Sequence, residues 1–511
     1  MEQGRRDFLK KSGVAVTGMA MLPQVLAAKR KQGKRPNLIY VFPDQMRRQA
    51  MGFWKKDKYR NLLNGDTDPV HTPSLDKFAD ESVVFTQVTS TSPICSPHRA
   101  MLFSGKYPHK NGVLWNCRAD RENQLDPEAE CFGDVLKKSG YSCGYIGKYH
   151  MDKPEANDPD RPGYYVNGAT RPEQRCWDAF TPVELRHGFD YWYSYGTFDV
   201  HKNPHYWDSN GKKHEPGIWS PIHEADKAIS YINNEENQRD EEKPFFLVVS
   251  MNPPHGPYYG LKDTDEDVFN EFYSKEKQPD VDELLNRPNV PADFGKCRKA
   301  VRYYMSHVTG VDREFGRIVE AVDKSGKADE TIIVFASDHG EMMGSHGKMG
   351  KTQLYEEAFG IPFIVRYPEK LKPATSDLLM DTPDIMPSLL GLMGLKDSIP
   401  EDVQGADYSK FFLKPKKKGG KPEVALFITH GNGRRGLRTD THSIMLSDKL
   451  EEGITLFDNI KDPYQQTPLD IDKNKKLSDD LLGKLANRLR EIEDPWFVDK
   501  TRSDVLPYGK V

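Results

Sequence analysis

Three apolar runs of strand length, each ending at a group of polar residues, constrain the fold of this 511-residue chain more than any other feature. They span residues 37–42, 245–250 and 331–336. Continuous apolar runs of this length are typical of strands that are buried on both faces of a parallel sheet. Ligands of such sheets bind at the carboxyl ends of the strands. The polar residues that follow the runs are therefore candidates for a functional site.

Helix-like stretches separate or follow these runs, at residues 74–81, 131–139 and 298–325. The alternation predicts an α/β fold with one large sheet covered by helices on both faces. A patch rich in Lys, Gly and Pro at 414–422 predicts a boundary between a main domain at 35–413 and a smaller one at 423–511. In the smaller domain we expect an antiparallel sheet and a helix at 478–493. Its strands are expected at 424–429, 436–438, 442–446 and 455–457.

The aromatic-rich stretch 191–219 interrupts this alternation. Its content of Gly, Pro, Asn and His predicts long loops. Four of its residues could either form a wall on which a sugar stacks or pack against the domain. They are His201, His205, Tyr206 and Trp207.

The first 28 residues differ in character from the rest of the chain. Arg5 and Arg6 precede a modestly apolar stretch at 14–28, which is rich in Gly, Ala and Met. The pattern resembles a twin-arginine export signal that is cleaved near Ala27 or Ala28. The apolar stretch is short for a membrane span. We therefore expect a periplasmic or secreted mature chain that is not inserted in a membrane. The alternative is a basic N-terminus that stays on the protein.

Charge and cysteine content exclude several classes of protein. The 73 basic and 77 acidic residues nearly balance, so no field of the whole molecule favours nucleic acid as a partner. Six scattered cysteines are too few for a disulfide-dense scaffold and form no paired CxxC zinc motif. With 37% hydrophobic residues, the chain can instead bury a large core.

The motif Cys95-Ser96-Pro97-His98-Arg99 carries the most chemical information. It resembles the Cys-x-Pro-x-Arg signature of the formylglycine-dependent (type I) sulfatases of the alkaline-phosphatase-like superfamily, whose fourth residue is usually Ser or Ala. In that family a maturation enzyme oxidises the cysteine to formylglycine. The hydrated aldehyde attacks sulfur with one hydroxyl, and its other hydroxyl later expels sulfate. We expect Pro97 and a helix that begins near Arg99 to place the nucleophile at a positive helix N-terminus.

The same resemblance implies a divalent metal site of Asp44, Gln45, Asp338 and His339, which follow the first and third apolar runs. Many sulfatases have Asp-Asp and Asp-Asn at these positions, so Gln45 and His339 are departures. Oxygen ligands suit Ca²⁺, whereas an imidazole ligand suits Mn²⁺ or Zn²⁺ better. The combination of Asp-Gln with Asp-His is familiar from the phosphonate monoester hydrolases of the superfamily.

Positively charged residues and proton donors are also implied by the resemblance. Lys148 corresponds to the lysine that binds nucleophile and sulfate, and His150 to the histidine that handles the proton during hemiacetal collapse. His255 corresponds to the histidine that contacts sulfate and protonates the leaving group. Lys351 matches the second sulfate-binding lysine, and Arg99 is expected to hold the formylglycine hydroxyl. Preorganised charges of this kind stabilise the transferred group in the transition state.

The resemblance extends over nearly the whole expected mature chain and implies hydrolysis of a sulfate ester, on a sulfated glycan or a small molecule. The implied fold has a large mixed sheet and a small C-terminal antiparallel sheet. His346 is a further candidate for substrate contact. Alternatives are a phosphonate monoester or phosphodiester hydrolase, a sulfamidase, or a catalytically silent glycan-binding relative. The last alternative requires the loss of a catalytic residue, and none is missing.

Overall fold

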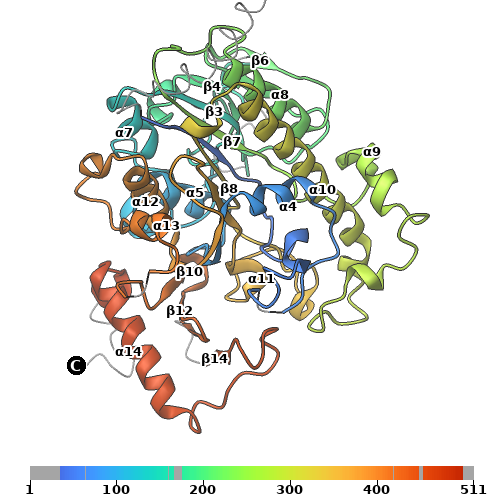
Figure 1. The fold of residues 1–511 in the computed structure, drawn as a ribbon, viewed down its shortest axis with the longest axis vertical. Coiled ribbons are helices and arrows are strands. Elements are labelled where there is room, and N and C mark those ends of the chain that lie inside the picture. The colour runs from blue at the N-terminus through green and yellow to red at the C-terminus, as the bar shows by residue number, and fades with distance from the viewer. Residues whose placement is uncertain are drawn as a thin grey trace, which may run out of the picture. The chain divides into compact units, whose positions relative to one another are not determined.

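One large mixed sheet organises the computed structural model, which describes residues 35–63, 65–158, 160–165, 175–417, 419–447 and 453–498 (Figure 1). Within these residues the strand order is β10-β2-β9-β8-β1-β7-β3-β4-β5-β6. The export signal expected at 1–28 lies outside the described residues. The division into domains at 35–413 and 423–511 stays a prediction.

Four parallel strands form the centre of the sheet. They are β8 (Thr331–Ala336), β1 (Asn37–Val41), β7 (Phe245–Ser250) and β3 (Ser142–Lys148). Each is hydrogen-bonded in parallel to its neighbour in that order, so their four carboxyl ends lie at one edge. Every residue of β1, β7 and β8 is buried, which explains their apolar sequences and confirms the three predicted strands.

The sheet continues on both sides of this centre. On one side lie β9 (Phe363–Arg366), β2 (Val83–Val88) and β10 (Ala374–Met380). Of these, β9 runs antiparallel to both β8 and β2, which makes the sheet mixed.

The aromatic stretch 191–219 supplies the strands on the other side, β4 (Tyr191–Tyr195), β5 (Tyr206–Asp208) and β6 (Lys213–His214). The prediction of long loops here is therefore wrong in part. The aromatic side chains stabilise these strands because they are buried, with Tyr206 and Trp207 both 0% exposed. His201 and His205 are buried as well, so these four residues pack in the domain and form no open wall for a sugar.

Helices cover both faces of the sheet, as predicted (Figure 1). On one face lie α4 (Pro73–Asp80), α8 (Ser220–Asn233) and α10 (Gly295–Lys324). On the other lie α5 (Cys95–Ser104), α7 (Phe132–Lys138), α12 (Ile385–Leu392) and α13 (Ser409–Leu413). Successive strand residues point to opposite faces, so Ile39 packs in the first core and Leu38 in the second.

Short helices complete the part of the chain that the structure describes. They are α6 (Pro108–Asn111), α9 (Glu266–Val268), α11 (Glu356–Phe359) and α15 (Pro495–Val498). Across the described ranges, no helix has both the length and the apolar character needed to cross a membrane.

A second, antiparallel sheet lies near the C-terminus, as predicted. Its strands, in order, are β11 (Ala425–Thr429), β12 (Arg434–Arg438), β13 (His442–Ser447) and β14 (Ile454–Asp458). Helix α14 (Lys475–Glu491) packs on it, with Leu481 and Leu485 in one cluster with Leu437 and Ile444. The backbone N–H of Ile428 donates to Thr91 O at 2.7 Å, which joins this sheet to the segment that leads into α5.

Candidate functional site

A hollow of about 280 Å³ opens at the carboxyl ends of β3 and β7. It brings together five of the predicted catalytic residues, Cys95, Lys148, His150, His255 and Lys351. Five further residues line it that the sequence analysis did not select, Asn116, Trp177, Thr197, Phe198 and Asp199. They lie in loops without a recognisable spacing pattern. Thr197, Phe198 and Asp199 fall in the aromatic-rich stretch 191–219, but nothing in the sequence marks them individually.

Cys95 is a free, buried cysteine at the first position of α5. The helix therefore begins at Cys95, four residues earlier than predicted, because Ile94 is extended and ends the preceding segment. Pro97 falls within the first helical turn, where its missing N–H costs nothing. The Oδ1 of Asn116 accepts a hydrogen bond from Ser96 N at 3.1 Å. The side chain at position 95 thus lies at the positive end of the helix dipole.

His98, the departure within the motif, is fully buried. Its Nδ1 lies 2.9 Å from the Oγ of Ser90 and 3.3 Å from the Oγ1 of Thr382. These contacts tie α5 to two neighbouring segments, which accounts for a polar residue at this buried position.

Four side chains place a ligand atom each within 4.8 Å of one another, those of Asp44, Cys95, Asp338 and His339. Asp44 and Asp338 follow the adjacent strands β1 and β8 and are both 0% exposed. Burial and the Asp44 carboxylate raise the pKa of Asp338. Two buried carboxylates that converge in this way favour a bound divalent cation.

The tautomer of His339 fits a metal ligand. Its Nδ1 lies 3.0 Å from Gly340 O and must carry the proton, because a carbonyl oxygen only accepts. The lone pair of Nε2 then faces the cluster, 3.5 Å from Asp44 Oδ1 and 3.4 Å from Cys95 Sγ. A metal-binding histidine commonly donates its second ring N–H to a carbonyl in this manner.

Gln45 completes the expected donor set, and Glu341 orients it. The Nε2 of Gln45 donates to the carboxylate of Glu341, which leaves the carbonyl Oε1 as the donor for a metal. Gln45 adopts φ 68°, a left-handed backbone conformation that is unusual outside glycine. Strain of this kind is often retained at functional sites. The residues present therefore fit a divalent cation.

Glu341 is fully buried and connects three segments of the site. Besides Gln45, its carboxylate accepts hydrogen bonds from Tyr258 OH at 3.2 Å, Met343 N at 2.8 Å and Gly350 N at 2.7 Å. Tyr258 follows His255, and Gly350 precedes Lys351. Glu341 is not among the residues predicted from the sequence, although it directly follows the Asp338-His339-Gly340 block.

Two lysines bring positive charge to the side chain of Cys95. The Nζ of Lys148 lies 2.7 Å from Asp44 Oδ2, and the Nζ of Lys351 lies 2.8 Å from Cys95 Sγ. Burial and Asp44 raise the pKa of Cys95, but Lys351, Lys148 and His339 bring it well below its usual value. A negative charge on the side chain at position 95 is therefore stabilised.

Arg99 lies against both carboxylates of the expected metal site. One guanidinium nitrogen lies 3.2 Å from Asp44 Oδ2 and 3.3 Å from Asp338 Oδ2. The other donates to Lys148 O at 2.8 Å and to Ser250 Oγ at 2.6 Å. Arg99 thus fixes the ends of the four central strands, β1, β8, β3 and β7, in relation to one another.

His150 is poised to accept a proton. Its Nε2 donates to Cys117 O at 3.1 Å, which leaves Nδ1 as the lone-pair nitrogen. Among the described residues, this buried Nδ1 has no conventional hydrogen-bond partner. Burial lowers the pKa of His150, and Cys95 acts in the opposite direction.

His255 is poised to donate a proton. Its Nδ1 lies 2.7 Å from Gly256 O and 3.4 Å from the Oδ1 of Asp199, which also accepts from Asn252 Nδ2 at 3.1 Å. Burial and Lys351 lower the pKa of His255, yet Asp199 leads the carboxylates that bring it above the usual value. Asp199 is therefore a positioning residue that favours the imidazolium form.

His346 lies apart from the residues that line this pocket. Its ring stacks on Tyr355 with the centroids 3.7 Å apart, and its Nε2 lies 3.2 Å from the amide of Asn289. Contact between His346 and a substrate stays a prediction.

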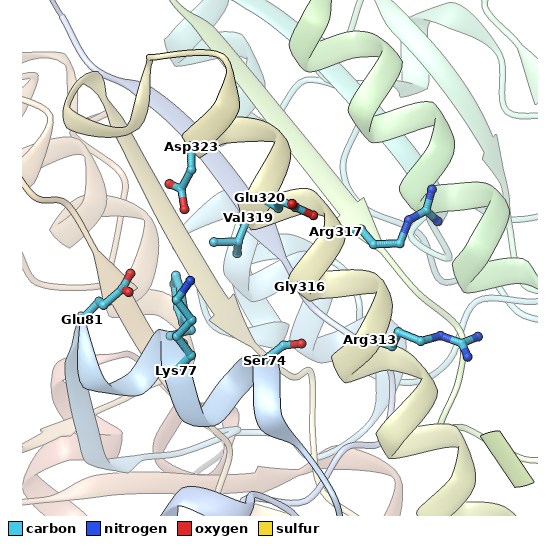
Figure 2. Close-up of a pocket in the computed structure, with 10 residues that line it drawn as sticks. Ser74, Lys77, Glu81, Arg313, Gly316, Arg317, Val319, Glu320 and Asp323 are labelled. Carbon is cyan, nitrogen blue, oxygen red and sulfur yellow. The ribbon is translucent and has the colours of Figure 1, made fainter. Parts of the chain in front are cut away.

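A second hollow, of about 380 Å³, lies between α4 and α10 (Figure 2). Its charged side chains do not converge, because Arg313 and Arg317 extend to one side of α10 and Lys77 and Glu81 lie on the other. Both arginines already form ion pairs with acidic side chains. This hollow has none of the converging chemistry of the pocket around Cys95.

Comparison with known proteins gives two family matches. The Sulfatase family matches residues 36–395, and the family described as N-sulphoglucosamine sulphohydrolase, C-terminal, matches residues 344–494. The first match covers the large sheet and all of the residues that converge in the pocket.

Individual relatives match over almost the full length. An Endo-4-O-sulfatase of Bacteroides thetaiotaomicron is 47% identical over 94% of this chain and 96% of its own. An Ulvan-active sulfatase of Formosa agariphila is 32% identical over 90% of this chain and 82% of its own. A solved Bacteroides thetaiotaomicron structure, labelled 4S-sulf in work on glycosaminoglycan metabolism, superposes with a TM-score of 0.89 at 47% identity. It covers 93% of this chain and 100% of its own.

Proposed function

Because this chain belongs to the sulfatase family, we propose that it removes sulfate from a sulfated carbohydrate, with a formylglycine made from Cys95 as nucleophile. Membership makes it a sulfuric ester hydrolase of the alkaline-phosphatase-like fold. One observation carries the mechanism: the side chain at position 95 meets two carboxylates, an imidazole and Lys351 at the N-terminus of a helix.

Formylglycine supplies a hydrated aldehyde, one hydroxyl of which is the nucleophile, while the other allows sulfate to leave as the aldehyde re-forms. Asp44, Gln45, Asp338 and His339 would hold a divalent cation, whose charge would neutralise sulfate oxygens and activate the nucleophile. Oxygen donors predominate in this set and favour Ca²⁺. The one imidazole makes Mn²⁺ and Zn²⁺ the alternatives.

The remaining residues bind the sulfate group and move protons. Lys148 and Lys351 hold two positive charges beside position 95, where the sulfate oxygens must lie during transfer. The unprotonated Nδ1 of His150 accepts a proton from the side chain at position 95. His255, kept protonated by Asp199, donates a proton to the leaving sugar oxygen. Opposite pKa shifts thus separate the base from the acid.

The relatives support the choice of substrate. The 47% identical relative is an Endo-4-O-sulfatase, and the 32% identical one is active on ulvan. We therefore propose that the substrate is a glycan that carries 4-O-sulfate groups. The protein removes these groups from sugars in the interior of the glycan. A maturation enzyme that recognises the 95–99 motif must first make the formylglycine. Export through a twin-arginine signal at 1–28 would deliver the enzyme to the periplasm or the exterior.

A second candidate is hydrolysis of a phosphonate monoester or phosphodiester. The pairs at 44–45 and 338–339 favour it, because both are departures from the usual sulfatase pattern. The two candidates differ in kcat/KM on aryl sulfate and aryl phosphonate monoesters. Our proposal requires the larger value on the sulfate.

The proposal is tested with the matured protein and a panel of defined sulfated oligosaccharides, by measuring free sulfate. We expect release from interior 4-O-sulfated sugars, and no release by the Cys95→Ala variant. Absence of sulfate release from every member, by protein in which formylglycine is present, overturns the proposal.

A further inference from the structure

We propose that a basic rim beside the pocket binds an anionic group on a sugar that neighbours the one carrying the reacting sulfate. The basic rim consists of Arg118, Arg121 and Arg175. The inference rests on the proposed function and narrows its substrate class to glycans with anionic groups on adjacent sugars. The anionic group is a carboxylate or a second sulfate.

The rim is continuous with the pocket walls. Asn116 and Trp177 line the pocket, and the three arginines belong to the same two short segments, 115–121 and 175–177. The guanidinium carbon of Arg118 lies 5.3 Å from the ring centroid of Trp177. A sugar chain that leaves the pocket over Trp177 therefore meets Arg118 first, with Arg121 and Arg175 in the same two segments.

Positive charge is concentrated at the rim. Burial, Arg118 and Arg175 lower the pKa of Arg121, although Asp120 opposes them, so Arg118 and Arg175 both lie close enough to Arg121 to repel its guanidinium group. Among the residues that the structure describes, Asp120 is the one carboxylate that forms an ion pair with the rim, and it pairs with Arg118. A bound anion would relieve the repulsion that remains.

Contacts with neighbouring residues hold Arg118 and Arg121 in place before any ligand binds. Arg121 lies over the ring of Trp115, 5.6 Å from its centroid, and donates to Asn116 O at 3.3 Å. Trp115 itself packs on the backbone of Gly431, where a Cβ would come within 2.3 Å of the indole. A preorganised guanidinium loses little entropy on binding and pairs with a carboxylate or sulfate through two parallel hydrogen bonds.

Asp199 makes another part of the pocket unsuitable for a second anion. The side chain of Asp199 is 46% exposed, and the two cations that most lower its pKa against the effect of burial, His255 and Lys148, are the ones that the proposed reaction uses. An anionic neighbour is therefore repelled from Asp199 and attracted to the basic rim.

The test uses the double variant Arg121→Ala/Arg175→Ala in the full matured chain. KM and kcat are measured on an aryl sulfate and on a sulfated oligosaccharide whose neighbouring sugar is anionic. We expect the KM ratio of oligosaccharide to aryl sulfate to rise about tenfold, which corresponds to about 1.4 kcal/mol, with kcat on the oligosaccharide little changed. Arg60→Ala, a surface arginine paired with Asp57, is the matched control and should leave the ratio unchanged.

Two further substrates identify the anionic group. One has the neighbouring carboxyl reduced to an alcohol, and the other lacks the second sulfate. The variant should lose its defect on whichever substrate lacks the group that the rim binds. An unchanged ratio, or an equal rise in KM for the aryl sulfate, overturns the inference. Failure of the proposed function can be distinguished from failure of this inference, because the wild-type protein would then release no sulfate from any substrate.

Discussion

The Nζ of Lys351 lies 2.8 Å from the Sγ of Cys95, although the two residues are 256 positions apart. The approach depends on the sheet, since α5 and the loop after β8 meet at its carboxyl edge. A hydrogen bond from Thr352 N to Pro93 O, 3.2 Å long, joins the two segments beside this contact. The side chain at position 95 thus faces a cation that its own segment does not supply.

Replacement of Lys351 should impair chemistry more than folding. For Lys351→Met we expect kcat to fall by about 100- to 1,000-fold, because a preorganised charge at the transferred group is lost. Lys348→Met, an exposed lysine in the same loop, is the control and should change kcat less than twofold. Equal losses in the two variants would argue against a sulfate-binding role for Lys351.

Glu341 should set the metal affinity through Gln45. We expect Glu341→Gln to weaken metal binding by about 10- to 100-fold, measured by calorimetric titration of the metal-free protein. Tyr258→Phe removes another hydrogen bond to the same carboxylate and should have a much smaller effect. In a Gln45→Ala background, Glu341→Gln should cost little further affinity. If Glu341→Gln lowers the metal affinity of the Gln45→Ala variant as much as it lowers that of the wild type, Glu341 does not act through Gln45.

The pH profile should report the pairing of His255 with Asp199. Asp199 helps to hold the pKa of His255 above its usual value, and the proposed reaction needs the protonated imidazole. In the Asp199→Asn variant the pKa of His255 falls, so the imidazole loses its proton at a lower pH. The alkaline limb of the kcat profile should therefore move to lower pH. Asp190→Asn, at the surface beside Lys137, should leave this limb in place. A limb that stays in place in Asp199→Asn would exclude His255 as the titrating acid.

The stability of the C-terminal sheet should depend on one buried carboxylate. Glu356 forms ion pairs with Arg48 and with Arg438 of β12, and all three side chains are buried. Removal of Glu356 leaves two buried charges unpaired, so Glu356→Ala should lower the free energy of unfolding by about 3–5 kcal/mol in denaturant titration. Glu320→Ala, which breaks an exposed pair, should cost less than about 1 kcal/mol.

The same residue predicts an acid dependence of stability. Although burial raises the pKa of Glu356, Arg438 and Arg48 hold it below the usual value. A carboxylate with a lowered pKa contributes stability above its unfolded pKa and loses it as the pH falls through the folded one. The stability difference between the wild type and Glu356→Ala should therefore shrink in acid. A difference that is constant with pH would contradict the ion pairing.

The parts of the fold that follow from short-range sequence patterns were predictable. Continuous apolar runs identified β1, β7 and β8, because a strand buried on both faces has no polar position. Residues that follow these strands, such as Asp44 and Asp338, could then be placed at one edge. The start of α5 was missed, because it depends on the backbone conformation of Ile94.

Residues that act through tertiary contacts could not be predicted in the same way. Asp199 and Trp177 lie in loops, and only the folded chain brings them to His255 and Arg118. The strands β4 and β5 were predicted as loops, because their stability comes from aromatic packing that composition alone does not reveal.

The central claim is that position 95 carries the nucleophile as formylglycine. Peptide mass mapping of the active, matured protein over the 93–99 segment tests it most directly, with the extent of conversion compared to kcat across preparations. We expect a peptide with the mass of formylglycine in place of Cys95, and a kcat that is proportional to the fraction of this peptide. A fully active preparation in which Cys95 is an unmodified thiol would contradict it.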